Sequence, residues 1–548
     1  MPKKPQARTS ILNVVRLPKK RFFASVVLTC LYYLVVMPIN ERIAFTPPAP
    51  ENIMFMVLLK VGFFAFLLLA IYGALSFFYG VYKRDYVYVR WLQYSLLYLA
   101  VATVFFILLY PGHWVWDEFN ILYAVQHYVP DAWQNIYTNI YYTFCLYLIP
   151  TGVSIVAFQG IIASIVVGYL LMRSETLTKK PIWRIVLFAV FVLPPIIINN
   201  LYPLRLTVYS YIEVAFLVRL LLLLLNKEVI NDKVSYLLQM TCMIVLLAFW
   251  RTEGIYYLLM VPLIIAKLGY FSAVLRREPT TYLILASSLA ILITGFAINK
   301  TTTNDRYGLT AMINPLSVMI QSPLAGEGID RRLQNIDEVI DLKLLKKYPS
   351  YTEIPGFWAG VVRDDYQQHL SLFRKEYIQL VLDNPGLFLD ARIKTFYATN
   401  GFDVTTPTPM GMLSFDSYSD PHSEMIVNRF YNTNSFSEPI NKPLKQGLTR
   451  SLLFLNDQDR IGTLGKVFWN IIPLVGAILL VLIVSLFHRQ WAWSLILTLV
   501  ALRVTILFLT APAHYFMYYL PVLMSGSCIV ILWLSQLRLK RLIKGRDA

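Results

Sequence analysis

Charged side chains are scarce in this sequence: only 15% of its 548 residues are Asp, Glu, Lys or Arg, whereas 57% are hydrophobic. The mean hydropathy is +0.56. A soluble protein of this composition would have too little polar surface to cover itself. The composition therefore excludes a soluble globular protein and indicates a chain that lies mostly in a membrane.

Cysteines and several familiar catalytic motifs are also scarce or absent. All four cysteines lie in apolar runs, and the long polar segment 299–465 contains none, which argues against a disulfide framework or a cysteine-based metal site. The same segment lacks a Gly-rich phosphate loop, a GxSxG motif and an HExxH motif. The chain has no convincing internal repeat, which disfavours the transporter folds that are built from repeats.

Many separate apolar runs reach the ~20 residues that are needed to cross a bilayer. They predict an all-α polytopic membrane protein with about twelve transmembrane helices, interfacial helices in the first large outer loop, and a mainly helical extracytoplasmic domain. The first run follows a basic arm but has no small-residue cleavage site, so we expect it to be retained as a helix. The expected spans are residues 22–40, 53–80, 93–110, 152–172, 184–200, 206–226, 234–250, 254–270, 281–298, 466–487, 490–510 and 512–536.

The net charge of +17 is concentrated beside these apolar runs. Residues 1–22 hold seven basic and no acidic side chains, and residues 538–546 hold five basic ones. Basic residues favour the cytoplasmic side, so both termini are expected in the cytoplasm and segment 299–465 outside the cell membrane. This placement favours contact with anionic lipid of the bilayer and argues against nucleic acid as a partner.

The predicted topology divides the chain into three parts. Residues 1–298 form an N-terminal membrane domain with a catalytic outer loop at 111–151. Residues 299–465 form the extracytoplasmic domain, and residues 466–548 form the C-terminal membrane helices and a basic cytoplasmic tail. Within the outer domain, helices are expected at 328–347, 363–384 and 384–399, and a Pro-, Ser- and Asn-rich stretch at 405–441.

An acidic stretch, PGHWVWDEFN at 111–120, directly follows the apolar run that ends at residue 110. A charge beside hydrocarbon is costly, so Asp117 and Glu118 are candidate catalytic residues. Small and polar residues recur every three to four positions over 116–131, which predicts an amphipathic interfacial helix led by Asp117. The two carboxylates would project about 100° apart and so serve different roles. Residues 136–149 predict a second interfacial helix.

Arginines at the outer ends of two predicted spans are the second candidate group. Arg205 and Arg251 lie where the positive-inside bias disfavours them. They are suited to bind a lipid phosphate through paired hydrogen bonds, or alternatively to reach headgroups as snorkelling side chains. A further candidate for binding the donor phosphate is His514, whose alternative is a solvated histidine without a site role. The candidate site-lining residues are Tyr202, Asn200, Glu253 and Trp116. The alternative for Glu253 is that it only pairs with Arg251.

Other polar residues have a structural interpretation. Glu213 and Arg219 lie inside one predicted span and are expected to make polar contacts between helices. Arg306, Asp364 and Asp365 are expected on the surface of the outer domain.

This layout resembles the GT-C superfamily of membrane glycosyltransferases, and especially a bacterial branch related to the protein mannosyltransferases. The resemblance covers nearly the whole chain through short motifs: Pro-Gly with Asp-Glu at 111–118, Tyr-Pro-x-Arg at 202–205, Arg251 after the seventh span, and Tyr-Tyr-Leu-Pro at 518–521. Two extra helices precede the acidic loop, and Tyr-Thr-Asn-Ile at 137–140 stands where the family often has His-Pro-Pro.

The resemblance implies transfer of a sugar from a polyprenyl-phosphate carrier on the outer leaflet, with inversion at the anomeric carbon. By the same resemblance, Asp117 would deprotonate the acceptor while Arg205 and Arg251 hold the phosphate that leaves. No nucleotide is expected, because the donor is already activated. No metal ligands are predicted, although the family varies in metal use and a divalent cation stays open.

The expected function is therefore an integral-membrane hexosyltransferase that acts on a cell-surface glycan or wall polymer. One alternative is a polysaccharide polymerase or ligase, which would also use outer arginines. Another is a lipid-linked glycan flippase or transporter, which should carry charged residues along a path through the membrane midplane. A non-catalytic scaffold is a third alternative and would not need Asp117.

Overall fold

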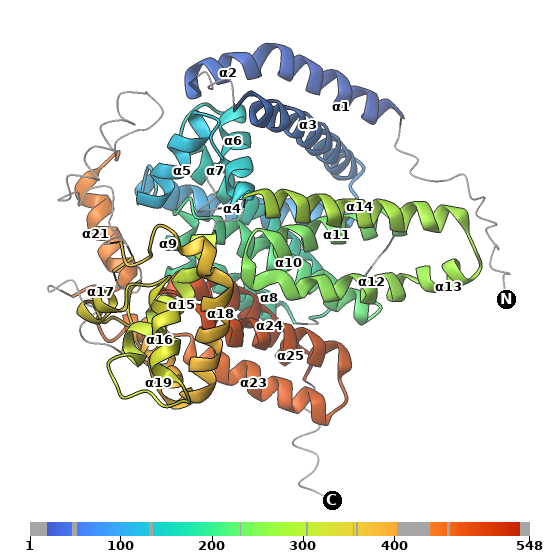
Figure 1. Ribbon diagram of the computed structural model, residues 1–548. Helices are drawn as coiled ribbons and strands as arrows, with labels where there is room; N and C mark the ends of the chain where they lie inside the picture. The colour runs from blue at the N-terminus through green and yellow to red at the C-terminus, as the bar shows by residue number, and fades with distance from the viewer. Residues whose placement is uncertain are drawn as a thin grey trace, which may run out of the picture.

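A computed structural model describes residues 19–46, 52–114, 116–130, 135–178, 180–228, 230, 232–302, 305–354, 356–357, 360–402, 439–456 and 461–537. These residues form helices and no strand, with two isolated β-bridges (Figure 1). The all-α prediction is confirmed for this part of the chain. Most of the two basic terminal segments and most of 405–441 lie outside the described residues.

Nine helices in the described ranges are long and apolar enough to cross a membrane, which confirms a polytopic membrane protein. Three of them are composite. The first joins α1 (Lys19–Leu31), a π-helical turn (Tyr32–Val36) and α2 (Met37–Ala44). The seventh joins α22 (Gly465–Phe468) to α23 (Ile472–Phe487). The ninth joins a 3-10 turn, η4 (Phe516–Tyr519), to α25 (Leu520–Gln536). The others are α3 (Ile53–Tyr82), α4 (Tyr86–Leu108), α7 (Val153–Ser174), α10 (Arg205–Leu224), α14 (Pro279–Thr302) and α24 (Trp491–Thr510).

The remaining three predicted spans are interrupted or short. The pair α8 (Pro181–Phe191) and α9 (Pro194–Asn200) is bent by 55°, at a point where proline removes a backbone donor. Helix α11 (Lys233–Phe249) has only 17 residues. The predicted span 254–270 begins as a 3-10 helix, η3 (Thr252–Leu259), and becomes α-helical only in α12 (Met260–Leu268). The count of twelve is thus not confirmed.

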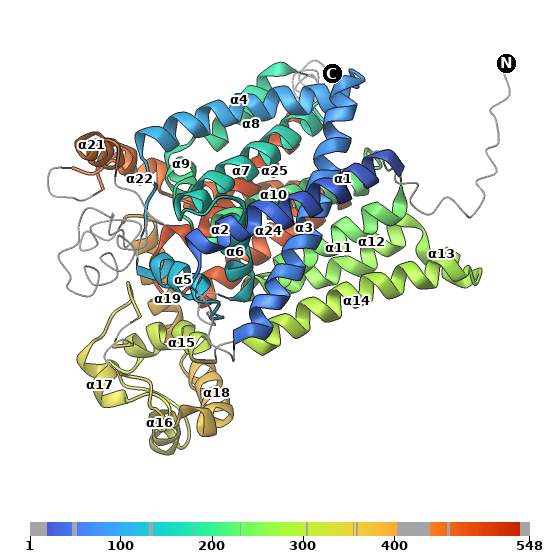
Figure 2. The same ribbon diagram turned by 90° about the horizontal axis from the view of Figure 1, so that it is seen from above.

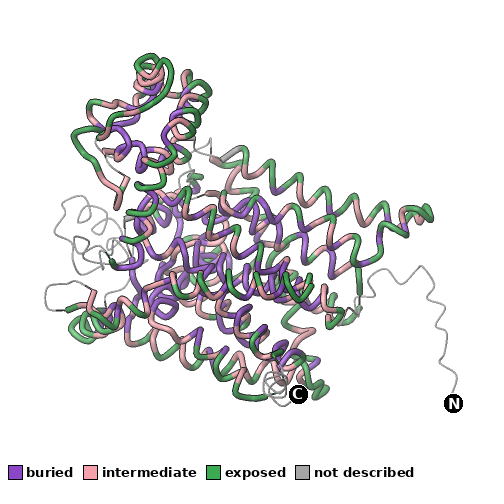
Figure 3. Tube along the Cα trace, turned by 90° about the horizontal axis from the view of Figure 1, so that it is seen from below, coloured by how far each residue is buried: buried purple, intermediate pink, exposed green. Residues whose placement is uncertain are grey.

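Helices α10 and α25 form the centre of the bundle. Of the 18 most apolar consecutive residues in each helix, 89% are buried in α10 and 78% in α25, compared with 6% in α4 and 17% in α3 and α14. A helix that is apolar all round is expected in such a central position. Figure 3 shows the buried core inside the bundle and exposed positions along the outer helices. Those outer faces are the surface that hydrocarbon would cover.

A smaller group of helices lies at one end of the bundle (Figures 1 and 2). It contains α15 (Asp305–Met319), α16 (Ile329–Asp337), α17 (Leu342–Lys347), α18 (Tyr366–Asp383) and α19 (Pro385–Thr399). We call it the end domain. Its buried side chains, such as Ile313, Ile336 and Phe373, form a hydrophobic cluster of their own. The predicted helix at 328–347 is split in two because the Asp341 carboxylate caps α17 by accepting from the Leu344 N–H.

The end domain is fastened to the bundle by a buried arginine. The Arg392 guanidinium donates to the carbonyl oxygens of Phe508 and Ala511 at 2.8 and 2.7 Å and to Asn314 Oδ1 at 3.3 Å. The last carbonyls of α24 have no partner within their own helix, so a cation here both satisfies them and fits the negative helix end. This contact fixes the end domain beside the start of η4.

The predicted interfacial helices of the outer loop exist, but they are packed inside the protein. They are α5 (Trp116–Gln126) and α6 (Ile136–Leu148). Helix α6 buries Tyr142 and Leu146 completely, and α5 buries Phe119 and Leu122. Burial of one face against protein does not place a helix relative to the bilayer, so the interfacial position of both helices stays a prediction. Hydropathy alone does not distinguish an apolar face that meets lipid from one that meets protein.

Candidate functional site

The acidic stretch is anchored by a tight turn after α4. Gly112 has φ +94°, and a Cβ there would lie 2.6 Å from the Leu201 carbonyl oxygen, so only glycine fits without movement. The backbone N–H of His113 donates to the same Leu201 oxygen at 2.8 Å. This contact joins the acidic stretch to the end of α9, as the turn between α9 and α10 begins.

The two acidic residues occupy the first turn of α5 but face different surroundings. Asp117 is partly exposed, whereas Glu118 is fully buried. The positive end of the helix dipole favours carboxylates at this position. The two carboxylates diverge as predicted, because Asp117 is partly exposed and Glu118 belongs to the packed face of α5. That they serve different roles stays a prediction. The side chain of Trp116, predicted to line the site, lies outside the described residues.

Arg205 is the first residue of α10 and contacts the end domain. Its Nη2 donates to the Tyr307 hydroxyl at 3.0 Å, and its guanidinium lies 5.5 Å from the centre of the same ring. Tyr307 belongs to α15. The arginine therefore sits where the bundle and the end domain meet, rather than against headgroups alone.

Arg251 and Glu253 form a two-point ion pair at the turn between α11 and η3. Arg251 Nη2 lies 2.5 Å from Glu253 Oε1, and its Nε donates to Oε2 at 3.1 Å. Burial by itself would raise the pKa of Glu253, but the neighbouring guanidinium outweighs it and lowers that pKa to about 2. Burial opposes the charge of Arg251, yet Glu253 raises its pKa overall. Both groups are therefore charged at neutral pH.

Three tyrosines bring the predicted charged residues into one cluster. The Arg251 guanidinium lies 5.9 Å from the centre of the Tyr518 ring and close enough to Tyr307 to interact electrostatically. The Asp117 carboxylate lies near enough to Tyr515 and Tyr518 for its charge to act on both hydroxyl groups. Burial, together with nearby carboxylates, raises the pKa of Tyr515. One carboxylate and two guanidinium groups from distant parts of the chain thus gather around these rings, and we call this the acid–arginine cluster.

His514 lies next to this cluster and is tied to the end domain. Its backbone N–H donates to the Thr352 carbonyl oxygen at 3.0 Å, and its Nδ1 contacts the same oxygen. Because a carbonyl only accepts, Nδ1 carries the proton. The opposite nitrogen, Nε2, is buried and has no hydrogen-bond partner among the described residues. The histidine is therefore a buried side chain held against Thr352, not a solvated one.

Tyr202 and Asn200, both predicted to line the site, are buried in the bundle. The Tyr202 ring stacks on His113 with centroids 5.3 Å apart. Asn200 donates to the Tyr98 hydroxyl at 2.8 Å and accepts from the Tyr211 hydroxyl at 2.9 Å. Asn200 is therefore part of a buried hydrogen-bond network that holds α4, α9 and α10 together.

A fully buried ion pair joins α10 to α24. Glu213 of α10 lies 3.4 Å from Arg503 of α24, and both are 0% exposed. Glu213 also accepts from the Tyr257 hydroxyl at 2.9 Å, and Arg503 donates to the Tyr209 hydroxyl at 2.6 Å. The expected interhelical role of Glu213 is confirmed. Arg219 has a separate partner, Gln239 of α11, at 3.1 Å, so its interhelical role is confirmed too.

Sequence reasoning missed Arg503, His113 and Tyr307. Arg503 is the only charge in the apolar run 491–510, and a charge at that depth is itself a signal. His113 lies within the acidic stretch and is fully buried, which its sequence context did not show. Tyr307 carries no sequence signal, because one tyrosine among 36 is unremarkable until its partner is known.

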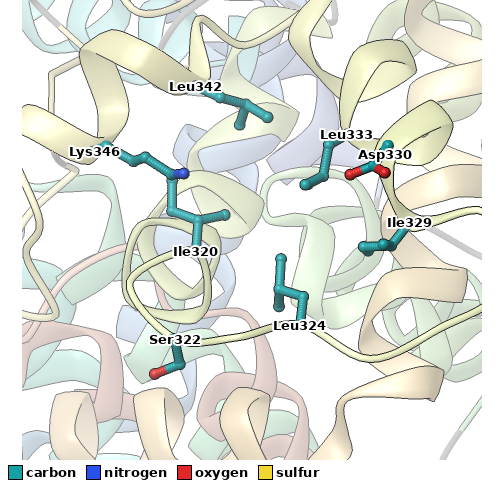
Figure 4. A pocket seen from close by; sticks show the side chains of 8 residues that line it. All are labelled: Ile320, Ser322, Leu324, Ile329, Asp330, Leu333, Leu342 and Lys346. Atoms are coloured by element: carbon teal, nitrogen blue, oxygen red, sulfur yellow. The ribbon is translucent and has the colours of Figure 1, made fainter.

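A pocket of about 230 Å³ lies elsewhere, in the end domain (Figure 4). Apolar side chains such as Leu324 and Leu333 line it, with the Lys346 ammonium and the Asp330 carboxylate at its walls. None of the predicted site residues contributes to it. Within the described ranges, no group of three or more His, Cys, Asp or Glu side chains is arranged to hold a metal ion.

Comparison of the chain with protein-family models, with curated proteins and with solved structures found no match. The resemblance to the GT-C glycosyltransferases therefore stays a prediction.

Proposed function

We propose that this protein is an integral-membrane glycosyltransferase that moves a sugar from a polyprenyl-phosphate carrier to a glycan or wall polymer at the cell surface. The observation that carries the proposal is the acid–arginine cluster. Asp117, Arg205 and Arg251 come from α5, α10 and the α11–η3 turn, and they meet around tyrosines at the membrane end beside the end domain. Such a transfer needs a base for the acceptor and cations for the departing phosphate.

In the proposed reaction, Asp117 accepts the proton of an acceptor hydroxyl as its oxygen attacks the anomeric carbon. The bond between that carbon and the phosphate oxygen breaks, and its electron pair leaves with the polyprenyl phosphate. Arg205 and Arg251 lie where they would stabilise the negative charge that develops on the phosphate. Glu253 would hold the Arg251 guanidinium in a fixed orientation, as its two contacts indicate.

The proposed site requires the end domain to face outward, with twelve crossings and both termini in the cytoplasm. The start of α1 and the end of α25 lie at the end of the bundle opposite α15–α19 (Figure 2), an arrangement that supports an even number of crossings. The nine long helices reach twelve if the bent α8–α9 pair, α11 and the η3–α12 segment each cross once.

Replacing Asp117 by Asn tests the proposed base. The change keeps the shape of the side chain but removes its proton affinity, so transfer should fall by roughly 10²–10⁴-fold. The measurement is transfer of labelled sugar in proteoliposomes, together with a surface-glycan profile of cells. The matched control is Asp364→Asn, an exposed carboxylate of the end domain that should leave transfer unchanged. Full activity of Asp117→Asn would refute the assignment.

Replacing Arg205 by Gln tests the phosphate contact. Loss of a charge-assisted hydrogen bond of about 1.5–3 kcal/mol should weaken polyprenyl-phosphate binding roughly 10- to 100-fold. Binding is measured directly on the purified protein. Arg331→Gln, an exposed arginine of α16, is the matched control. Unaltered affinity in the Arg205 variant would count against the clamp.

A lipid-linked glycan transporter is the second candidate, because the buried Glu213–Arg503 pair places charge inside the bundle. The two functions separate in proteoliposomes: a transporter moves the labelled lipid between leaflets without forming a new glycosidic bond. A polymerase or ligase would use the same cluster and would differ by requiring a lipid-linked polymer as one substrate.

A further inference from the structure

An apolar groove lies between α4, α7 and α9, away from the acid–arginine cluster. It encloses about 230 Å³ and is lined mainly by apolar residues, among them Leu99, Phe106, Val156, Gly160 and Ile197. The α4 residues belong to the last part of that helix and the α7 residues to its first part, so the groove lies in the half of the bundle nearer the end domain.

The groove opens at the periphery of the bundle, on a surface that a bilayer would cover. Helix α4 runs along the periphery of the bundle (Figure 2), and only a small part of it is buried. Two residues on the groove, Thr103 and Ile161, are exposed. A chain from a membrane lipid can therefore enter from the side without crossing the protein.

A polar turn borders the groove where α4 and α9 end. Leu201 lines the groove, and its carbonyl oxygen accepts from the His113 backbone N–H at 2.8 Å. The His113 imidazole is fully buried, and neither of its ring nitrogens has a hydrogen-bond partner among the described residues. Such a group costs free energy unless a ligand or water satisfies it.

A basic helix packs against the same end of the groove. Helix α21 (Lys442–Leu453) has the sequence KPLKQGLTRSLL, with three basic residues and no acidic one, and it contacts α9 and α4. Its Lys445 ammonium is buried close enough to His113 to help burial lower the pKa of that imidazole. Thr449, one turn further on, has a buried hydroxyl without a hydrogen-bond partner in the described part of the chain. Lys442 and Arg450 are exposed on the same helix.

We propose that the groove and α21 together bind one anionic phospholipid of the surrounding bilayer. An acyl chain lies between α4 and α7, and the phosphate headgroup lies against α21, with Lys445 as its countercharge and His113 and Thr449 as further polar contacts. This site is separate from the proposed transfer reaction and does not depend on it.

The two parts of the site contribute differently. Bilayer hydrocarbon is as apolar as the groove, so the acyl chain gains packing in the groove but little selectivity. The headgroup provides selectivity, because a phosphate attracts the basic residues of α21 whereas a zwitterionic headgroup largely cancels that attraction. The protein should therefore retain phosphatidylglycerol in preference to phosphatidylcholine.

Native mass spectrometry of the purified full chain tests the proposal, with both lipids offered in mixed micelles. The wild type should retain one phosphatidylglycerol with roughly tenfold preference over phosphatidylcholine. Gly160→Leu should abolish retention, because a Cβ there meets only Ala102 Cβ at 3.9 Å and the rest of the side chain fills the groove. The matched control is Gly73→Leu on α3, where a Cβ meets nothing within 4 Å, and it should retain the lipid.

A second pair of variants tests the headgroup contact. Lys445→Gln should reduce the preference for phosphatidylglycerol to about twofold or less. Because Lys445 is buried and its loss can impair folding, the double change Lys442→Gln with Arg450→Gln alters only exposed charges and should weaken the preference without changing thermal stability. Equal retention of the two lipids by the wild type, or undiminished retention by Gly160→Leu, would overturn the proposal. Displacement of phosphatidylglycerol by equimolar polyprenyl phosphate would also overturn it and would assign the groove to the carrier lipid.

Discussion

Arg251 and Glu253 are buried charged groups, and each is the countercharge of the other. Their side chains are 5% and 14% exposed, so little solvent screens the pair. Because the folded pKa of Glu253, about 2, lies below its unfolded value, its stabilisation is present above pH ~4.3 and is lost as the pH falls towards 2. At neutral pH, where the proposed transfer would occur, both groups are charged and the ion pair is intact.

Glu253→Gln should destabilise the protein by about 3 kcal/mol, because it leaves the buried Arg251 guanidinium without a countercharge. Thermal unfolding in detergent at pH 7 measures the effect. Glu278→Gln is the control, since its pair with Arg276 is 3.8 Å long and exposed, and it should cause no measurable change. Equal stability of the Glu253 and Glu278 variants would contradict the prediction.

His113 should make stability depend on pH. Burial, with Lys445 nearby, lowers its pKa to about 3, below the unfolded value of about 6.5. The unfolded state binds the proton first, so stability is full above pH ~6.5 and falls by about 1.4 kcal/mol per pH unit below it. We expect a lower unfolding temperature at pH 5.5 than at pH 7.5. His113→Gln should reduce this dependence, whereas His488→Gln, at an exposed helix end, should retain it.

At the scale of elements, the contact between α10 and α24 combines apolar packing with one buried ion pair. The central helix α10 is buried on nearly all sides, so apolar burial by itself does not fix its rotation about its axis. The Glu213–Arg503 pair and its tyrosine partners form their contacts at one rotation of α10. A buried polar contact of this kind selects an arrangement more than it adds stability.

Arg503→Met should destabilise the protein by about 3–5 kcal/mol, because the Glu213 carboxylate stays buried without a countercharge. The double change with Glu213→Leu should recover most of this loss, since neither charge is then buried. A double-mutant cycle on unfolding temperature measures the coupling. Additive effects of the two single changes would show that the pair does not act as a unit.

At the scale of the whole molecule, the end domain and the proposed site should face the outside. Lys343→Cys on α17 should react with a membrane-impermeant maleimide in intact cells, and Lys83→Cys, between α3 and α4, should react only after permeabilisation. Both residues are exposed, and the background carries Cys242→Ser to remove the exposed native thiol. Labelling in the opposite order would reverse the topology and with it the leaflet of the proposed reaction.

The amino-acid sequence by itself determined the membrane class, the helices and the position of most helix ends. Runs of apolar residues long enough to cross a bilayer leave the backbone few alternatives to helix, since every peptide group must be paired within the segment. The sequence also placed Asp117, Arg205 and Arg251 at the ends of helices, because charges are costly further inside.

Only the tertiary structure decided which of these groups meet. The contact of Arg205 with Tyr307, of Glu213 with Arg503 and of His113 with Tyr202 joins side chains from different helices. The same packing buried Glu118 and left Asp117 partly exposed, although the two are neighbours in sequence. Hydropathy reports how apolar a helix is, but the rotation of that helix and its neighbours depend on side-chain packing along its whole length.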